Sequence, residues 1–173
     1  MTSLWVPESA NDEANERAKT VYATYGVAMY LAACLEADLV HAFALHKILD
    51  AKESAELIAD PWHAGYKKNL VKLISHVEDR SPTDPKLVDD LTECRKRRNL
   101  LAHSYWRDHD EDLCSKAGEL KMIRGLEADI EFFQAVRDRL NEVVADPAHQ
   151  QLGFTPEQFD AEFRRLYRKA NGE

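Results

Sequence analysis

A long stretch without helix breakers constrains this chain more than any other feature. From Glu13 to Leu49 there is no proline and a single glycine. Apolar residues recur there at alternating steps of four and three, at Val21, Tyr25, Ala28, Ala32, Leu35, Leu39 and Ala42. This period predicts a long amphipathic helix. A second row at Tyr22, Met29, Ala33, Val40 and Phe43 widens the apolar face, so we expect the helix to pack in a bundle or across a dimer interface.

Two more helices are predicted in the middle of the chain. Pro61 can open the first of them, since proline suits the first turn of a helix. Its expected apolar face consists of Tyr66, Leu70, Leu73, Ile74 and Val77. The next helix is expected to begin after a loop, at Asp84-Pro85, where the aspartate can cap the first turn. Its stripe begins with Leu87, Leu91 and Cys94.

The last third of the chain predicts one long helix and one short one. Apolar residues at helical spacing favour a helix from Asp110 to Val144, which Asp146-Pro147 is expected to end. A final helix is expected near Thr155-Pro156-Glu157-Gln158, followed by Phe159, Phe163 and Leu166. No alternation typical of strands competes with these helices. We therefore expect an all-α fold, a helical bundle of about five helices.

The length of 173 residues is typical of one domain. We expect a single domain over residues 1–173, with residues 1–12 as a flexible N-terminal segment. The start has no basic region followed by an apolar core, and no apolar run reaches the length of a membrane span, so we expect a cytoplasmic protein without membrane contact. The three cysteines form no C-x-x-C pair, which favours reduced, packed thiols over a disulfide framework or a zinc site.

A net charge of −8 disfavours long-range attraction to nucleic acid. Any contact with RNA must therefore use a local basic patch, because phosphate binding depends on Lys and Arg. The candidate patch is the run Arg95, Lys96, Arg97 and Arg98, with Arg107 nearby.

The third predicted helix carries a break in its apolar pattern. Continued at the same steps, its stripe reaches Arg98, Leu101 and Tyr105. Arginine is seldom buried without a partner, so Arg98 must extend to solvent or lie in a cleft or interface. Asn99 and His103 are four residues apart and neighbour each other on the helix. Arg98 and His103 point roughly 140° apart in a regular helix, so their convergence needs arginine reach, an unwound last turn or a second subunit.

The segment from Arg98 to Tyr105, RNLLAHSY, resembles the R-x-x-x-x-H-x-Y signature of HepT toxins in the HEPN ribonuclease superfamily, in which Asn often follows the Arg. The resemblance covers eight residues and is supported by the predicted helix order. It implies a homodimer whose two motifs form one composite cleft. It further implies a nucleotidyltransferase antitoxin as partner, which would modify Tyr105 with AMP.

These residue types suit cleavage of RNA without a metal or another cofactor. His103 can act as a general acid or base in attack by a ribose 2′-hydroxyl. Arg98 can stabilise the charge that develops on the phosphorus oxygens, and Asn99 can orient His103 or the phosphate. We therefore expect a metal-independent endoribonuclease, and the resemblance to the HEPN superfamily implies that it acts as a toxin or defence effector.

Other interpretations of the same residues stay open. The basic run from Arg95 to Arg98 can be a solvated face, His103 a cation favoured at a helix end, and Tyr105 a packed aromatic residue. The chain would then be a non-catalytic HEPN-like dimer that binds a nucleotide or a nucleotidyltransferase, or a helical module for protein interaction. His41 and His46 on the first helix do not form a metal-binding set with Asp38.

Overall fold

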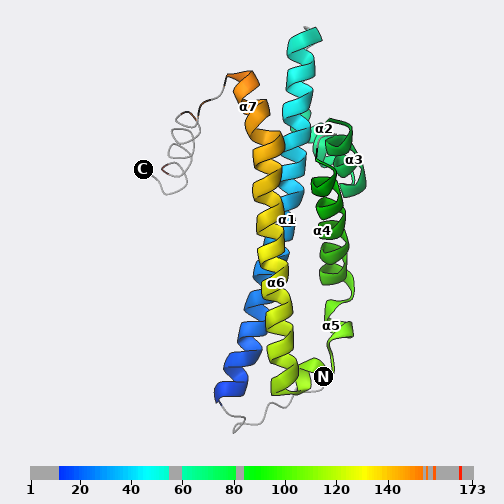
Figure 1. Cartoon of the computed structure of the whole chain (residues 1–173). Helices are drawn as coiled ribbons and strands as arrows, with labels where there is room; N and C mark the ends of the chain where they lie inside the picture. The colour runs from blue at the N-terminus through cyan, green and yellow to red at the C-terminus, as the bar shows by residue number, and fades with distance from the viewer. Residues whose placement is uncertain are drawn as a thin grey trace. The chain divides into compact units, whose positions relative to one another are not determined.

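The computed structural model describes residues 12–54, 60–80 and 84–153 and the single positions 155, 158 and 168. Throughout this described part the chain is helical and contains no strand, which confirms the all-α class (Figure 1). The elements in chain order are α1 (Asp12–Ser54), α2 (Pro61–Tyr66), α3 (Leu70–Arg80), α4 (Pro85–His103), α5 (Tyr105–Asp108), the 3-10 turn η1 (Asp112–Cys114), α6 (Lys116–Leu140), the π turn η2 (Asn141–Ala145) and α7 (Asp146–Leu152).

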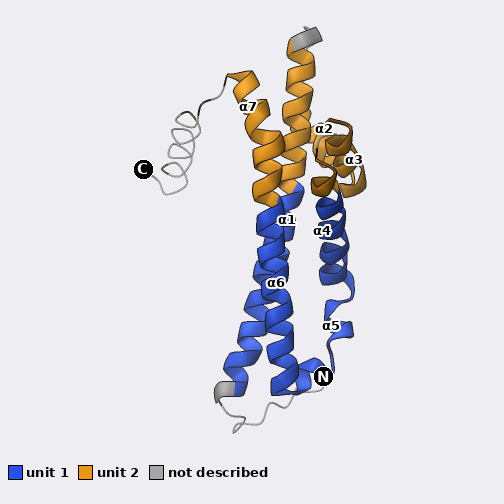
Figure 2. Cartoon of the chain, viewed as in Figure 1, with its two compact units in different colours: residues 1–36, 89–136 blue, residues 37–88, 137–173 orange. Residues whose placement is uncertain are grey.

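The chain divides into two compact units, coloured separately in Figure 2. Unit 1 comprises residues up to 36 together with 89–136, and unit 2 comprises residues 37–88 together with those from 137 onward. Unit 1 contains the whole RNLLAHSY segment. Its largest fully buried side chains come from α1, α4 and α6, and they are Val21, Leu91, Cys94, Leu101, Met122, Leu126 and Phe133.

The first apolar row of α1 forms the buried face of this helix. All its members are buried except Tyr25, which is partly exposed. The second row divides between the units: Val40 and Phe43 are buried in unit 2, whereas Tyr22 and Ala33 in unit 1 are exposed. For Tyr22 and Ala33 the expected packing across a dimer interface stays a prediction.

Helix α1 also contains a stretch that is long and apolar enough to cross a membrane by length and composition alone. The sequence expectation that no apolar run reaches this length was therefore wrong. Half of the stretch is buried inside the protein. The absence of membrane contact stays a prediction.

The single helix predicted after Pro61 is two helices, α2 and α3. A Cβ on Gly65 would lie 2.8 Å from Val40, so α2 packs against α1 at a distance that glycine permits. Asn69 then accepts a hydrogen bond from the Lys72 amide at 3.0 Å and caps the new helix. The period of the apolar residues gave no indication of this interruption, and Tyr66 at its edge is exposed.

The start of α4 confirms the predicted cap, because the Leu87 amide donates to the Asp84 carboxylate at 3.1 Å. The predicted helix from Asp110 to Val144 differs at both ends. It begins as α6 at Lys116, after η1, and Pro147 does not end it. The π turn η2 precedes α7, whose first turn accommodates the proline because amides there need no partner within the helix.

Gly153 ends α7 in the left-handed conformation with φ of 81°. Beyond it, Thr155 and Gln158 exchange side-chain and amide hydrogen bonds at 3.0 and 3.4 Å, as the predicted capping residues should. The residues Phe159, Phe163 and Leu166 expected on the final helix lie outside the described residues, as do residues 1–11.

Candidate active site at the end of helix α4

Arg98 lies on α4 at the position where the apolar stripe is interrupted, and its side chain is about one-third exposed. Its Nε lies 2.7 Å from Oε1 of Glu36 on α1, in an ion pair. Its Nη1 donates to Oδ1 of Asn99 at 3.2 Å. An arginine in this position therefore has an ionic partner and remains accessible to solvent, in agreement with the expectation that it would not be buried alone.

Asn99 and His103 are both exposed on α4, and His103 is its last residue. Asn99 contacts Arg98 through its side-chain oxygen, whereas no described hydrogen bond or ion pair joins His103 to Arg98, Asn99 or Tyr105. One chain thus brings together two of the four motif residues by direct contact. His103 is accessible at the helix end, where it can meet a substrate or a second chain.

Tyr105 is the first residue of α5 and is 5% exposed. Its ring lies 5.3 Å from that of Tyr25 and 5.3 Å from that of Trp106, and Tyr22 also packs on Trp106. Its hydroxyl is buried and has no hydrogen-bond partner within the described part of the chain. Burial, together with the charges of Asp129 and Asp112, raises the pKa of Tyr105 to about 12. The motif tyrosine is therefore a packed aromatic residue in this structure.

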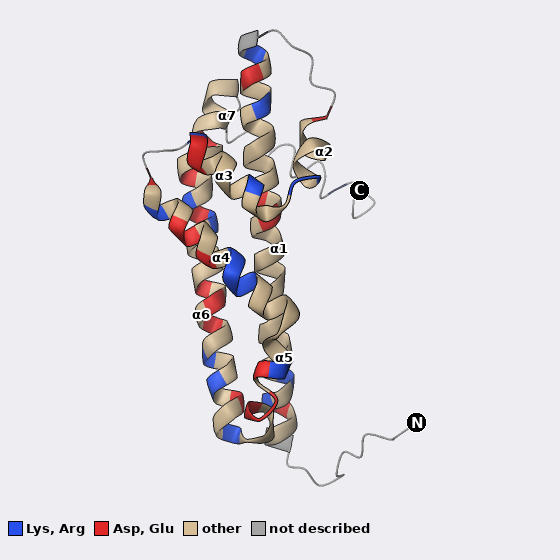
Figure 3. Cartoon of the chain, turned by 90° about the vertical axis from the view of Figure 1, so that its right-hand side faces the viewer, with Lys and Arg blue, Asp and Glu red and all other residues tan. Residues whose placement is uncertain are grey.

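The basic run forms a blue band on α4 in Figure 3, but its members differ in environment. Lys96 is exposed and lies 3.6 Å from Glu93, while Arg95 is partly exposed. Arg97 is held by carboxylates of two helices, Glu93 at 3.1 Å and Asp129 of α6 at 3.0 Å. Arg107 on α5 is 77% exposed and contacts only its neighbour Asp108 at 3.3 Å among the described residues.

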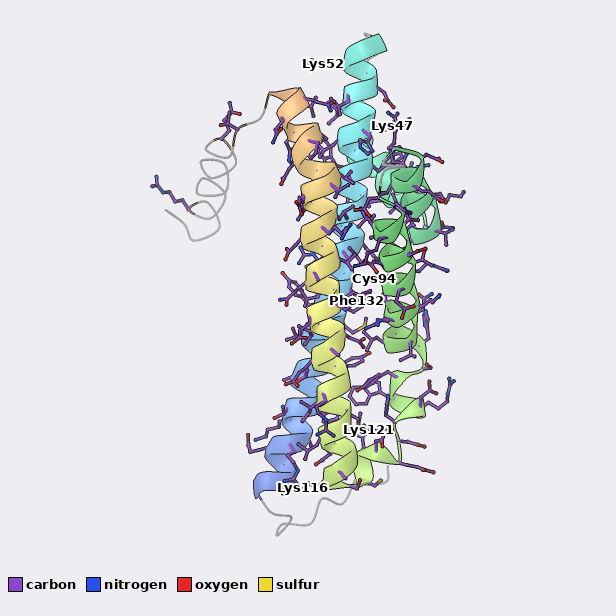
Figure 4. All side chains as sticks on the ribbon, in the orientation of Figure 1. Lys47, Lys52, Cys94, Lys116, Lys121 and Phe132 are labelled. Carbon is purple, nitrogen blue, oxygen red and sulfur yellow. The ribbon has the colours of Figure 1, made fainter. Side chains whose placement is uncertain are left out.

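Arg97 also lies 4.1 Å from the ring centroid of Phe132, which Figure 4 labels on α6. Its two carboxylate partners respond differently. The hydrogen bond from Arg97 lowers the pKa of the exposed Glu93, whereas burial raises the pKa of Asp129 despite the same cation. The desolvation of the more buried carboxylate outweighs its ion pair. We therefore regard Arg97 as a structural residue, although the sequence grouped it with the RNA-binding candidates.

A second histidine lies close to Tyr105. The ring centroid of His109 is 4.5 Å from that of Tyr105, and its Nδ1 lies 2.8 Å from a carboxylate oxygen of Asp112. Such a contact fixes the orientation and the tautomer of an imidazole. The hydrogen bonds from His109 and Lys121 lower the pKa of the Asp112 carboxyl. His109 is thus a natural comparison for His103 in any test of function.

Sequence reasoning did not identify Glu36 as part of the site. A signal existed, since residues 20–35 of the first helix contain no charge and Glu36 is the first charged residue after them. Arg98 breaks the apolar pattern of the facing helix in the same way. Two opposite charges that each interrupt an apolar row are expected to pair.

The cysteines differ in their surroundings. Cys94, labelled in Figure 4, is buried, and desolvation raises its thiol pKa to about 12. Cys114 is exposed, so the expectation of a packed thiol was wrong for this residue. Within the described ranges no group of three or more His, Cys, Asp and Glu residues could hold a metal ion.

Comparisons with family models, curated proteins and solved structures found no match to the chain.

Proposed function

We propose that the chain is a metal-independent endoribonuclease of the HEPN type, acting as a toxin or defence effector. The proposal is carried by the motif from Arg98 to Tyr105 at the exposed end of α4. In support, the Arg98 guanidinium and the His103 imidazole, which are the two groups that the chemistry requires, are both accessible to solvent. The adjacent Asn99 contacts Arg98 and can orient it.

In the proposed reaction an imidazole of His103 removes the proton from a ribose 2′-hydroxyl. The 2′-oxygen then attacks the adjacent phosphorus, and the bond from phosphorus to the 5′-oxygen breaks. The leaving oxygen takes a proton from a second imidazole, that of His103 in another copy of the chain. Arg98 stabilises the negative charge on the phosphorus oxygens. The products end in 2′,3′-cyclic phosphate and 5′-hydroxyl.

A homodimer belongs to this proposal, and one face of α1 supports it. From residue 22 to 33 the exposed positions of α1 carry no charge, and they are Tyr22, Ala23, Gly26, Val27, Tyr30 and Ala33. Val27 and Tyr30 are 46% and 67% exposed. Monomeric soluble proteins rarely leave such a continuous apolar face in water. This face, which we call the α1 face, leads toward Glu36 and hence toward Arg98, so a second copy on it would approach the motif.

The same α1 face favours an alternative function, a helical module that binds another protein. The non-catalytic HEPN-like dimer that binds a nucleotide or nucleotidyltransferase is a further alternative. A nucleotidyltransferase antitoxin would have to reach the hydroxyl of Tyr105, which is buried, so this side chain would have to leave its packed position. Co-expression with such an enzyme and intact-mass analysis tests this; an unmodified Tyr105 removes this partner from the proposal.

The decisive experiment uses purified protein, single-stranded RNA and EDTA. We expect cleavage, with cyclic phosphate at the new 3′ ends. His103→Ala and Arg98→Ala should each lower the rate by on the order of 100-fold or more, while folding, followed by circular dichroism, is retained. His109→Ala is the matched control and should stay active. A strict need for divalent metal, or loss of activity in His109→Ala but not in His103→Ala, contradicts the assignment.

A further inference from the structure

Glu36 pairs with a cation of another helix, as Glu119 and Asp129 of unit 1 also do, whereas others there pair within their own helix. Glu16 and Glu93 each pair with a cation on their own helix, Lys19 and Arg97 respectively. The neighbours of Glu36 at three and four positions in either direction along α1 are Ala32, Ala33, Leu39 and Val40, so its own helix offers no cation. Its carboxylate instead reaches across to Nε of Arg98 at 2.7 Å.

The contacts of Arg98 use one end of its planar fork. Of the five N–H bonds of a guanidinium, one on Nη1 donates to Asn99, while Nε lies 2.7 Å from Glu36 in an ion pair. The second N–H on Nη1 and both on Nη2 have no hydrogen-bond acceptor among the described residues. Two parallel N–H bonds at this end match the oxygens of a phosphate.

The ion pair is weak enough to leave this end available. Both side chains are about one-third exposed, at 34% and 35%. Pairs exposed to this degree contribute little to stability, because water competes for both charges. Glu36 therefore contributes little to the free energy of unfolding. Its effect is on the orientation of Arg98, because it restricts a long and otherwise mobile side chain.

We propose that Glu36 is a positioning residue, which holds Nε of Arg98 so that the Nη1 and Nη2 end faces a phosphate of the RNA. This inference rests on the proposed ribonuclease function. Glu36 touches neither the phosphate nor the ribose. It acts by fixing the geometry of Arg98, and a small displacement of such a group lowers the rate of the chemical step more than it weakens substrate binding.

The first test compares three variants in the RNA cleavage assay. Glu36→Ala should lower kcat by about tenfold or more with a smaller effect on KM. Glu36→Gln keeps an oxygen acceptor for Nε and should recover most of that loss. Glu16→Gln, which removes the charge of an acidic residue paired on its own helix, is the matched control and should retain wild-type activity. Faster cleavage by Glu36→Ala would overturn the proposal, because Glu36 would then restrain rather than direct Arg98. Equal loss in Glu36→Ala and Glu36→Gln would overturn it as well.

The second test does not depend on activity. The Nε–H signal of Arg98 in a nitrogen-15 NMR spectrum, assigned by its absence in Arg98→Lys, should exchange more slowly with water in the wild type than in Glu36→Ala. Addition of a 2′-deoxy oligonucleotide should leave the Nε–H protected while the Nη signals shift. Loss of Nε–H protection on binding would overturn the proposal, because the phosphate would then displace Glu36. If RNA is not cleaved but the signal behaves as expected, only the ribonuclease function fails.

Discussion

The hydroxyl of Tyr25 on α1 donates to the carbonyl of Leu101 in the last turn of α4, at 3.0 Å. Carbonyl groups in a last helical turn lack partners within the helix, so a side chain from elsewhere can satisfy one of them. The bond fixes the end of α4 two residues before His103. His103, the proposed general base, is therefore the last residue of a helix end that is held in place, although its own side chain lies in solvent.

Tyr105 allows a test of the aromatic cluster next to this helix end. We predict that Tyr105→Phe leaves the free energy of unfolding unchanged or raises it by up to about 1 kcal/mol, because it removes a buried hydroxyl without a described partner while the ring stays packed. Urea unfolding measures the change. A clear fall in the free energy of unfolding would show that the hydroxyl has a hydrogen-bond partner in solution.

Arg97 and Arg107 should separate stability from RNA binding. Arg97→Ala should lower the free energy of unfolding by about 1–3 kcal/mol, since it leaves the partly buried Asp129 without its cation.

Arg107→Ala should change stability by less than about 0.5 kcal/mol. It should weaken RNA binding and reduce the slope of log affinity against log salt by about 0.7. Binding is measured on the His103→Ala background, and the reverse pattern would contradict the roles assigned here.

The α1 face predicts the oligomeric state. Sedimentation should give twice the chain mass of 19.8 kDa. Val27→Glu places a charge in the middle of the face and should produce a folded monomer that no longer cleaves RNA. Glu127→Ala, at an exposed position of α6 in the same unit, should remain dimeric. A wild-type monomer at micromolar concentration would remove the composite cleft.

Unit 2 should be sensitive to acid through His76. Its Nε2 lies 3.2 Å from Nδ1 of His46, and burial, with the nearby charges of His46, Arg80 and Lys47, lowers the pKa of His76 to about 4 against the opposing effect of Asp50. The unfolded chain then binds a proton more readily than the folded one. Stability is therefore fully present above about pH 6.5 and falls between that value and about pH 4.

His76→Gln should reduce this acid sensitivity because glutamine does not titrate. We expect its melting temperature to fall less than that of the wild type between about pH 7.5 and about pH 5. His63→Asn, which changes an exposed histidine of α2 in the same unit, should behave like the wild type. An acid-induced loss equal to that of the wild type in His76→Gln would exclude His76 as its source.

The sequence predicted the parts of the fold that depend on local patterns. The apolar row of α1 and the cap at Asp84 follow from helical period and from side-chain chemistry within one turn. The sequence did not predict that α2 and α3 are separate helices, nor that a Cβ on Gly65 would lie 2.8 Å from Val40, a contact between segments far apart in the chain. Apolar period alone carries no information about such a contact.

The candidate site was predictable to a similar degree. The motif residues were found by their spacing, but spacing does not reveal the surroundings of a side chain. Arg97 and Arg107 belong to the same basic segment, yet one lies between two carboxylates and the other in solvent. Likewise the spacing that identified Tyr105 did not indicate that its hydroxyl would be buried.

In the π turn Asn141–Ala145 the number of residues matters as well as their identity, because it sets the orientation of the helix that follows. If this segment wound into the regular helical repeat without losing a residue, everything after it would rotate by about 100°. His149 would then turn away from His41, whose Nε2 lies 3.0 Å from its own, and Ala148 would leave the apolar cluster with Leu45 and Ala145. The segment should accept conservative replacements of its side chains more readily than the insertion of a further residue.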